Sequence, residues 1–366
     1  MTDEEYMELA LAEAERARGN TSPNPLVGCV IVNAQGEIVG KGYHHKAGEA
    51  HAEVNALRAA GTKARGATAY VTLEPCSHYG RTGPCCEALI KAGIKRVVAA
   101  ANDPNPKVAG RGFARLRAEG VEVVQGVLAE HAYEQNEVFM HWMTTGKPFV
   151  ALKYAMTLDG KIATATGDSK WITGLEARTQ GHYLRSIYDG ILVGKETVLQ
   201  DNPELTCRLT AGKNPVRIIL DTNLSLPLDR KVFTDKAAST IVIAKRGADE
   251  DKIAELQAQG VRVITVATKQ GHVSITALLE VLGKENITSI MVEGGSQIHG
   301  AFLDAGEVNR VYAFIAPKLV GGRAALTPVG GEGFAQIAQG YTLRKVTTTK
   351  LGQDILINGV VAKEAD

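Results

Sequence analysis

The chain has 366 residues, of which 45% are hydrophobic and 22% are charged, as in an ordinary water-soluble protein. Its 41 basic and 40 acidic side chains give a net charge of +1, so we expect no nucleic-acid partner, which would require clustered cationic excess. The chain also has an acidic start unlike a signal peptide and no apolar run long enough for a membrane span, so we expect a cytoplasmic protein without a membrane partner.

Helical and strand patterns alternate along the chain, which predicts an α/β architecture in both halves. The predicted elements of the first half are, in chain order, a helix over 3–18, a hairpin of strands 26–32 and 37–43, a helix from residue 51, a strand over 69–73, a helix from residue 85, a strand over 95–101 and a helix over 109–119. Residues 144–148 contain Gly146 and Pro148 and separate this half from a new strand that begins at Phe149. We therefore predict two domains, residues 1–146 and 147–366.

A set of potential metal ligands lies at the predicted element ends of the first half. His51, Cys76 and Cys85 offer one imidazole and two thiolates, an accepted ligand set for a catalytic zinc with an open position for water. Glu53, two residues from His51, is not needed as a metal ligand and is expected to carry protons during the reaction. The pattern His-x-Glu followed by Pro-Cys and a second Cys is typical of zinc deaminases, in which the metal activates water against an amino-bearing ring carbon.

Two other classes remain open from these residues. A structural zinc would need a fourth ligand, for which Cys86 and His78 are the available candidates. An RNA-editing deaminase is disfavoured by the near-zero net charge and by the eight residues between Cys76 and Cys85. The five cysteines do not form a secreted disulfide framework, and we assign the three that are not predicted ligands to packing: Cys29, Cys86 and Cys207.

The segment between the two cysteine ligands, together with four further motifs, resembles the deaminase half of the bifunctional riboflavin biosynthesis deaminase–reductases. These motifs are residues 77–84 between the cysteines, then 23–30, 42–44, 103–106 and 108–112. Gly83 stands where that family commonly has proline. The resemblance implies a cytidine-deaminase-like αβα sandwich over residues 1–146.

The second half resembles the reductase half of the same family. Three segments carry the likeness, residues 153–163, 169–173 and 194–208, with Thr157 in place of the usual serine. The resemblance implies a dihydrofolate-reductase-like α/β domain over residues 147–366. A strand end, a glycine pair and a helix start over residues 290–296 can hold phosphate, although the dinucleotide fingerprint Gly-x-Gly-x-x-Gly is missing.

The resemblance also implies site residues and cofactors. The cofactors are Zn²⁺ and NADPH. Residues expected to contact the dinucleotide are Ala155, Trp171, Thr197, Asp201, Thr222 and Gly295. Residues expected to contact substrate are Ser169, Arg185, Leu205, Arg208 and Glu293. Lys153 interrupts an apolar strand, so it either snorkels at a strand end or faces the cleft; we expect that it faces the cleft and contacts substrate.

The reaction implied by the resemblance has two steps. The first is zinc-dependent hydrolytic deamination of 2,5-diamino-6-(5-phosphoribosylamino)pyrimidin-4(3H)-one, with Glu53 as the proton carrier. The second is NADPH-dependent reduction of the ribosyl side chain of the resulting uracil to the ribityl form. The expected partner is thus a small phosphoribosylamino-pyrimidine, and we expect a homo-oligomer.

Overall fold

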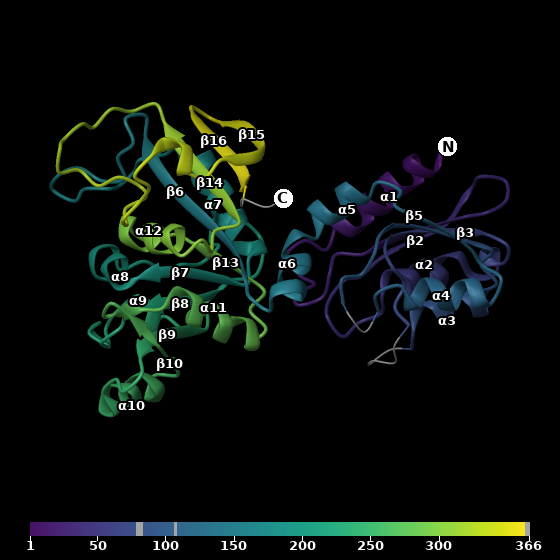
Figure 1. Cartoon of the computed structure of the whole chain (residues 1–366), viewed down its shortest axis with the longest axis horizontal. Coiled ribbons are helices and arrows are strands. Elements are labelled where there is room, and N and C mark those ends of the chain that lie inside the picture. Colours follow the sequence, from purple (N-terminus) through teal and green to yellow (C-terminus); the bar gives the residue numbers. More distant parts are fainter. Residues whose placement is uncertain (78–82, 106–107, 363–366) are drawn as a thin grey trace. The chain divides into compact units, whose positions relative to one another are not determined.

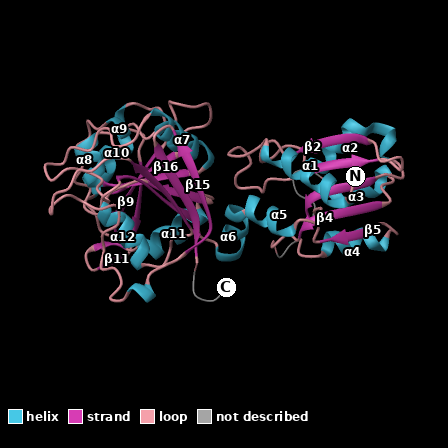
Figure 2. Cartoon of the chain, turned by 90° about the horizontal axis from the view of Figure 1, so that it is seen from above, coloured by secondary structure: helices cyan, strands magenta, loops and turns pink. Residues whose placement is uncertain are grey.

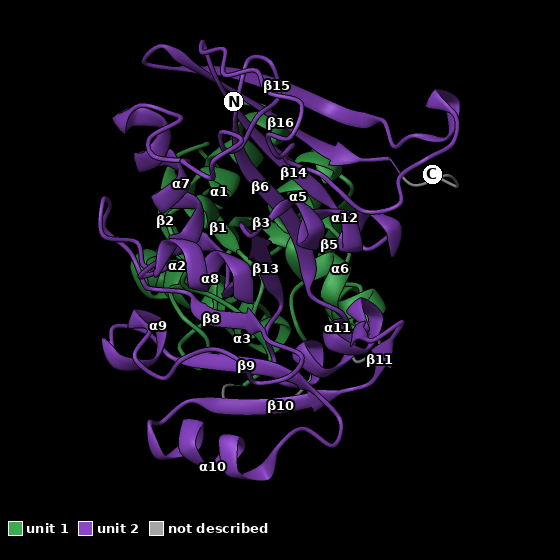
Figure 3. Ribbon diagram, turned by 90° about the vertical axis from the view of Figure 1, so that its left-hand side faces the viewer, with its two compact units in different colours: residues 1–146 green, residues 147–366 purple. Residues whose placement is uncertain are grey.

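The computed structural model describes residues 1–77, 83–105 and 108–362. It divides into two compact units, Met1–Gly146 and Lys147–Asp366 (Figure 3). Gly146 ends the last helix of the first unit with a φ of 69°, a left-handed conformation that glycine adopts without steric cost. Each unit has its own sheet and its own hydrophobic clusters, so each is described by itself.

Unit 1 contains a five-stranded sheet in the order β2-β1-β3-β4-β5. The first two strands form the predicted hairpin, and β3, β4 and β5 run parallel to one another. The strands are β1 (Gly28–Val32), β2 (Ile38–Tyr43), β3 (Thr68–Leu73), β4 (Arg96–Ala101) and β5 (Glu122–Gln125). The helices are α1 (Asp3–Glu15), α2 (Ala52–Ala60), α3 (Cys85–Ala92), α4 (Arg111–Ala118), α5 (Ala129–Gln135) and α6 (Glu137–Thr145).

Both faces of this sheet are covered, because alternate residues of each strand point to opposite sides. In β1, Cys29 and Ile31 join one cluster with α2, α3 and α4, whereas Val30 and Val32 join a second cluster with α1, α5 and α6. Figure 1 shows α1 and α5 on one side of the strands and α2, α3 and α4 on the other. The predicted αβα sandwich is therefore confirmed.

Close packing of α2 on β2 fixes the start of that helix. A Cβ atom on Gly42 would lie 2.4 Å from the backbone nitrogen of Ala56, and one on Gly40 would lie 2.3 Å from the carbonyl oxygen of Ala56. Only glycine permits this approach of strand and helix backbones. Because α2 is held so closely, the residues at its amino end have a fixed position relative to the sheet.

Unit 2 contains a nine-stranded sheet in the order β10-β9-β8-β7-β13-β6-β14-β16-β15 (Figure 1). Figure 2 shows its strands in magenta, with β16 and β15 side by side. From β10 to β14 neighbouring strands are parallel, and β16 and β15 are antiparallel additions at the edge. The strands are β6 (Phe149–Thr157), β7 (Gly190–Gly194), β8 (Val216–Leu220), β9 (Thr240–Lys245), β10 (Arg262–Val266), β13 (Ser289–Val292), β14 (Arg310–Ala316), β15 (Leu343–Leu351) and β16 (Asp354–Val361), with a separate hairpin of β11 (Thr268–Lys269) and β12 (His272–Val273).

Helices cover both faces of the parallel part of this sheet. Alternate residues of β7 again separate the two clusters, since Leu192 packs with α11 and α12 whereas Ile191 and Val193 pack with α8, α9 and α10. The helices are α7 (Leu175–Ile187), α8 (Lys195–Asp201), α9 (Lys231–Thr234), α10 (Glu250–Ala258), α11 (Ile275–Lys284) and α12 (Ser296–Asp304). The parallel order places the carboxyl ends of β8, β7, β13 and β6 along one edge, which is the usual ligand edge of such sheets.

The observed element boundaries differ from the predicted ones by up to three residues. The first helix ends at Glu15 rather than at residue 18, and the first strand begins at Gly28 rather than at residue 26. His51 is the N-cap of α2 with an extended backbone, so the helix itself starts at Ala52. Within the part of the chain that the structure describes, no helix is long and apolar enough to cross a membrane.

Candidate functional site

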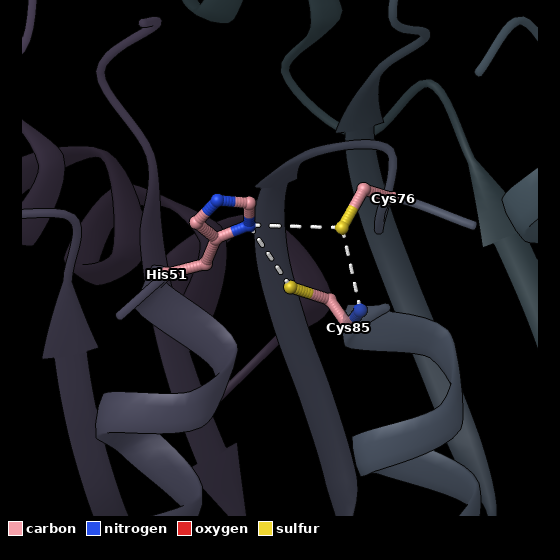
Figure 4. A group of neighbouring side chains, drawn as sticks. All are labelled: His51, Cys76 and Cys85. Atoms are coloured by element: carbon pink, nitrogen blue, oxygen red, sulfur yellow. Dashed lines mark hydrogen bonds between the residues drawn. The ribbon is translucent and has the colours of Figure 1, made fainter. Parts of the chain in front are cut away.

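The three predicted metal ligands meet at the ends of three elements of unit 1 (Figure 4). His51 caps α2, Cys76 follows β3 after two residues, and Cys85 is the first residue of α3. The Nδ1 atom of His51 lies 3.2 Å from Sγ of Cys85 and 3.6 Å from Sγ of Cys76. One ligand atom from each residue lies within 4.8 Å of the others, so a single ion can reach all three.

The donor set and its surroundings fit a zinc ion. The backbone N–H of Cys85 donates to Sγ of Cys76 at 3.3 Å, which favours a thiolate there. A hydrogen bond from the Cys85 thiol, with others from His51 and from the Cys85 backbone, lowers the pKa of Cys76 to about 4 although burial opposes this shift. Among the described residues this is a set of three ligands without Cys86, which leaves a tetrahedral ion one open position. The other proposed fourth ligand, His78, lies outside the described residues.

Glu74 ties the segment before Cys76 to the beginning of α4. Its buried carboxylate accepts the backbone N–H groups of Gly110 at 2.9 Å and of Gly112 at 3.0 Å. A Cβ atom on Gly112 would lie 1.9 Å from the carbonyl oxygen of Pro75, so the two backbones touch. Sequence reasoning did not single out Glu74, although its place directly before Pro75-Cys76 was a usable signal.

Glu53 lies in the first turn of α2 and is 3% exposed. Its Oε2 atom has no hydrogen-bond partner among the described residues. Burial, followed by the charge of nearby Cys76, raises the pKa of this carboxyl group to about 7. A buried carboxyl oxygen without a hydrogen-bond partner destabilises a folded protein. We therefore expect this oxygen to gain a hydrogen-bond partner when a ligand binds.

A cavity of about 450 Å³ opens beside the metal ligands and Glu53. Its lining adds four residues that sequence reasoning placed in motifs but did not name as site residues, Asn24, His44, Asp103 and Asn105, and also Phe139, which no motif marked. Nδ1 of His44 lies 3.2 Å from the carbonyl oxygen of Ala50, and its Nε2 lies 3.1 Å from Nδ2 of Asn24. If His44 donates to that carbonyl, Nε2 accepts from the Asn24 amide, which leaves the amide oxygen of Asn24 to accept from a ligand.

Replacing each of the two adjacent cysteines, Cys85 and Cys86, by serine in turn tests which of them is the metal ligand and which is a packing residue. We expect Cys85→Ser to lose the metal and Cys86→Ser to keep it, because Cys85 faces the ligand cluster whereas Cys86 packs in the core with α2 and α4. Zinc content per folded chain, measured after dialysis, is the readout. Retention of zinc by the first variant and its loss from the second would overturn the ligand assignment.

In unit 2 the predicted substrate residues Arg185, Glu293 and Lys153 form one largely buried cluster. Arg185 donates to both carboxylate oxygens of Glu293, at 2.7 and 2.8 Å, and Nζ of Lys153 lies 3.5 Å from the same carboxylate. Although burial raises the pKa of Glu293, the charges of Arg185 and Lys153 bring it well below its usual range. Glu293 is therefore a carboxylate just after β13 that holds two cations, Arg185 of α7 and Lys153 of β6.

The remaining predicted substrate residues lie in different settings. The side chain of Leu205 is 3% exposed and packs in the cluster with α8, so its contact with a ligand would have to come from its backbone. The guanidinium of Arg208 is half-exposed and lies 3.6 Å from Glu204. Ser169 lies partly exposed in the loop between β6 and α7.

His182 on α7 was not found by sequence reasoning, and no motif marked it. It is 6% exposed, and its Nδ1 atom has no partner among the described residues. Burial, and then the charges of Arg185 and Arg208, lower its pKa to about 4, so the imidazole is neutral near pH 7. Its electrostatic coupling to these arginines places it beside the Glu293 cluster.

Three of the predicted dinucleotide residues, Thr197, Thr222 and Gly295, follow the carboxyl ends of the parallel strands β7, β8 and β13. Gly295 has a φ of 59°, and a Cβ atom there would lie 3.8 Å from Oγ1 of Thr197. A Cβ atom on Gly294 would lie 2.6 Å from Cα of Val193, so this loop lies against the end of β7. Such a side-chain-free loop before a helix can cradle a diphosphate with backbone N–H groups, and the residues thus fit the dinucleotide. Thr222 follows β8, and Ala155 lies in β6.

Trp171 and Asp201 lie toward the outside of the same unit. Trp171 is 58% exposed and so is not a core residue, and the Arg178 guanidinium lies 4.3 Å from its ring centroid. Lys170 lies 3.0 Å from the carboxylate of Asp201 at the end of α8. The neighbouring residues Lys170 and Trp171 thus connect the β6–α7 loop to both helices, α7 and α8.

Comparison with known proteins gives full-length matches. The model described as the cytidine and deoxycytidylate deaminase zinc-binding region matches residues 1–101, and that of the RibD C-terminal domain matches residues 148–357. The riboflavin biosynthesis protein RibD of Actinobacillus pleuropneumoniae is 49% identical over 99% of this chain and 96% of its own length. The solved structure of Acinetobacter baumannii RibD has a TM-score of 0.87 at 37% identity and covers 99% of both chains. A Thermotoga maritima diaminohydroxyphosphoribosylaminopyrimidine deaminase/5-amino-6-(5-phosphoribosylamino)uracil reductase has a TM-score of 0.85 at 38% identity and covers 98% of this chain and 99% of its own.

Proposed function

The chain belongs to the RibD family of bifunctional riboflavin biosynthesis proteins, and from that membership we propose how its residues carry out the two steps. The protein is a zinc-containing deaminase and a reductase, and its second unit has the dihydrofolate-reductase-like fold of the family. As its substrates we propose those that the name of the Thermotoga maritima relative gives, first the diaminopyrimidine and then the corresponding uracil.

Deamination takes place in the cavity of unit 1. His51, Cys76 and Cys85 would hold the zinc ion, which would supply an activated water as the nucleophile near neutral pH. Glu53 takes the proton from that water and delivers it to the departing amino group, and its unpartnered buried oxygen is the observation that carries this role. The neighbouring polar residues Asn24, Asp103 and Asn105 orient the pyrimidine ring and its substituents.

Reduction takes place at the edge of unit 2 where β6, β7, β8 and β13 end. NADPH supplies the hydride for the sugar carbon. We assign the dinucleotide to Ala155, Trp171, Thr197, Asp201, Thr222 and Gly295. Substrate contacts are assigned to Lys153, Ser169, Arg185, Leu205, Arg208 and Glu293. Arg185 is held by Glu293 in a two-point pair, so its guanidinium is oriented before substrate arrives, while half-exposed Arg208 remains available for the sugar phosphate.

Separate fragments of the chain test this division of labour. We expect a fragment of residues 1–146 to release ammonia from the diaminopyrimidine without NADPH, and one of residues 147–366 to oxidise NADPH only with the deaminated substrate. The reason is that each unit has its own hydrophobic clusters and its own set of site residues. Ammonia release and absorbance of NADPH are the measurements, with the full chain as control. A folded, zinc-loaded first fragment that releases no ammonia would contradict the assignment.

We further propose a cytoplasmic enzyme that assembles from identical copies. Reducing conditions suit a chain whose five cysteines are all unpaired, two of them as metal ligands. Strand β15 ends the nine-stranded sheet and leaves Val346 and Ile355 of the β15–β16 hairpin partly exposed, as a subunit contact would require.

A further inference from the structure

Three loops lie side by side at the carboxyl edge of the unit 2 sheet. The strands β13, β7 and β8 are consecutive neighbours and parallel, so the segments that follow them occupy adjacent places along that edge. These segments are residues 293–295 after β13, residues 195–197 after β7 and residues 221–225 after β8. Since neighbouring strands lie about 4.8 Å apart, the glycine loop and the loop after β8 are roughly 10 Å apart.

The acidic residue of the loop after β8 is turned into the protein. Asp221 is 1% exposed, and its two carboxylate oxygens accept the hydroxyl of Ser225 at 3.0 Å and the backbone N–H of Leu226 at 2.8 Å. In the dinucleotide-binding folds that use NAD, an acidic residue binds the ribose 2′-hydroxyl and so disfavours a phosphate there. Asp221 is occupied inside the loop and does not present that carboxylate.

Lys195 presents a positive charge at the same place. It follows β7 directly, and its Nζ lies 3.3 Å from Oγ of Ser225, so its side chain reaches from the loop after β7 to the loop after β8. Its nearby acidic neighbour is Glu196, at 3.7 Å and 69% exposed, and such a solvated pair binds a lysine only weakly. The ammonium group is therefore available to an anion beside Ser225.

We propose that Lys195, positioned by its hydrogen bond to the hydroxyl oxygen of Ser225, binds the 2′-phosphate of NADPH and makes this reductase prefer NADPH to NADH. The inference rests on the placement of the dinucleotide diphosphate at Gly295 proposed above. With the diphosphate there, the adenosine ribose lies toward β8, and its 2′ substituent faces the lysine and not a carboxylate. A lysine ammonium is a suitable partner because it binds phosphate as a point charge without demanding one orientation.

Binding measurements on the full-length chain test the proposal without relying on turnover. The ligands are NADPH, NADH and adenosine 2′,5′-bisphosphate, which carries the 2′-phosphate but neither the diphosphate nor the nicotinamide. Dissociation constants are measured by calorimetry for the native protein, Lys195→Gln and Lys195→Arg. The matched control is Lys284→Gln, since exposed Lys284 ends α11 just before β13 begins and so lies toward the opposite edge of the sheet.

For Lys195→Gln we expect affinity for NADPH and for the bisphosphate to fall about ten-fold to one-hundred-fold, as for loss of a charged hydrogen bond, with NADH affinity changed less than about two-fold. Lys195→Arg should restore most of the NADPH affinity, and Lys284→Gln should behave like the native protein. Equal weakening of NADPH and NADH, or no weakening of either, would overturn the role of Lys195. A native protein that binds neither dinucleotide would instead contradict the cofactor site itself.

Discussion

Glu53→Gln should lower the rate of ammonia release by a factor on the order of 10² or more while the protein retains its zinc. Glutamine has nearly the same shape but cannot accept and return a proton. The carboxyl group is buried beside the ligand cluster, and its Oε2 atom has no partner among the described residues, so it is the group placed to serve the incoming water. Zinc analysis and a coupled ammonia assay give the two readouts.

The controls for this variant isolate the proton-transfer role. Glu87→Gln changes the same group on α3, where Glu87 pairs with Arg115 at the surface, and should leave ammonia release unchanged. Reduction of the supplied uracil substrate by Glu53→Gln should also be unchanged, because unit 2 contains all of the residues assigned to that step. Loss of zinc from Glu53→Gln would show that the carboxylate is a ligand, contrary to the assignment.

Glu293→Gln should destabilise unit 2 by about 3–5 kcal/mol and abolish reduction, because it leaves two largely buried cations without their carboxylate. The side chains of Glu293 and Arg185 are only 8% and 14% exposed, so water cannot replace the lost charge. Differential scanning calorimetry measures the stability, and NADPH oxidation with the uracil substrate measures the activity. Ammonia release should persist at temperatures where unit 2 remains folded.

A pH series adds a second, independent readout. The folded pKa of Glu293 is lowered, so its contribution to stability is present above the unfolded value of about 4.3 and is lost as the pH falls through the folded value. The Gln variant should lack this part of the acid dependence. As control, Glu285→Gln removes the exposed partner of Arg262 and should change stability by no more than about 1 kcal/mol. Equal stability of the Glu293 variant and the native chain would refute the cluster argument.

The sequence alone was sufficient for the metal centre and for the α/β class of both halves. His51, Cys76 and Cys85 were recognisable because each lies at an element end that local pattern predicts, and because the chemistry of zinc limits its ligands to a few residue types. The family likewise followed from long motifs in both halves, and the comparisons confirm it. Element ends were less certain, since local propensity does not say where tertiary packing stops a helix.

Only the tertiary structure determined which residues act together in unit 2. Arg185 and Glu293 are 108 positions apart. Arg185 is on α7, which connects β6 to β7, and Glu293 follows β13, which lies between these two strands in the sheet. No local pattern specifies that strand order. The pairing of β7 with β8 likewise brings Lys195 to Ser225. Burial without a partner, as for Glu53 and His182, is likewise a property of the packed structure. Motifs depend on short spacing along the chain, whereas charge pairing and desolvation depend on which distant segments the fold places in contact.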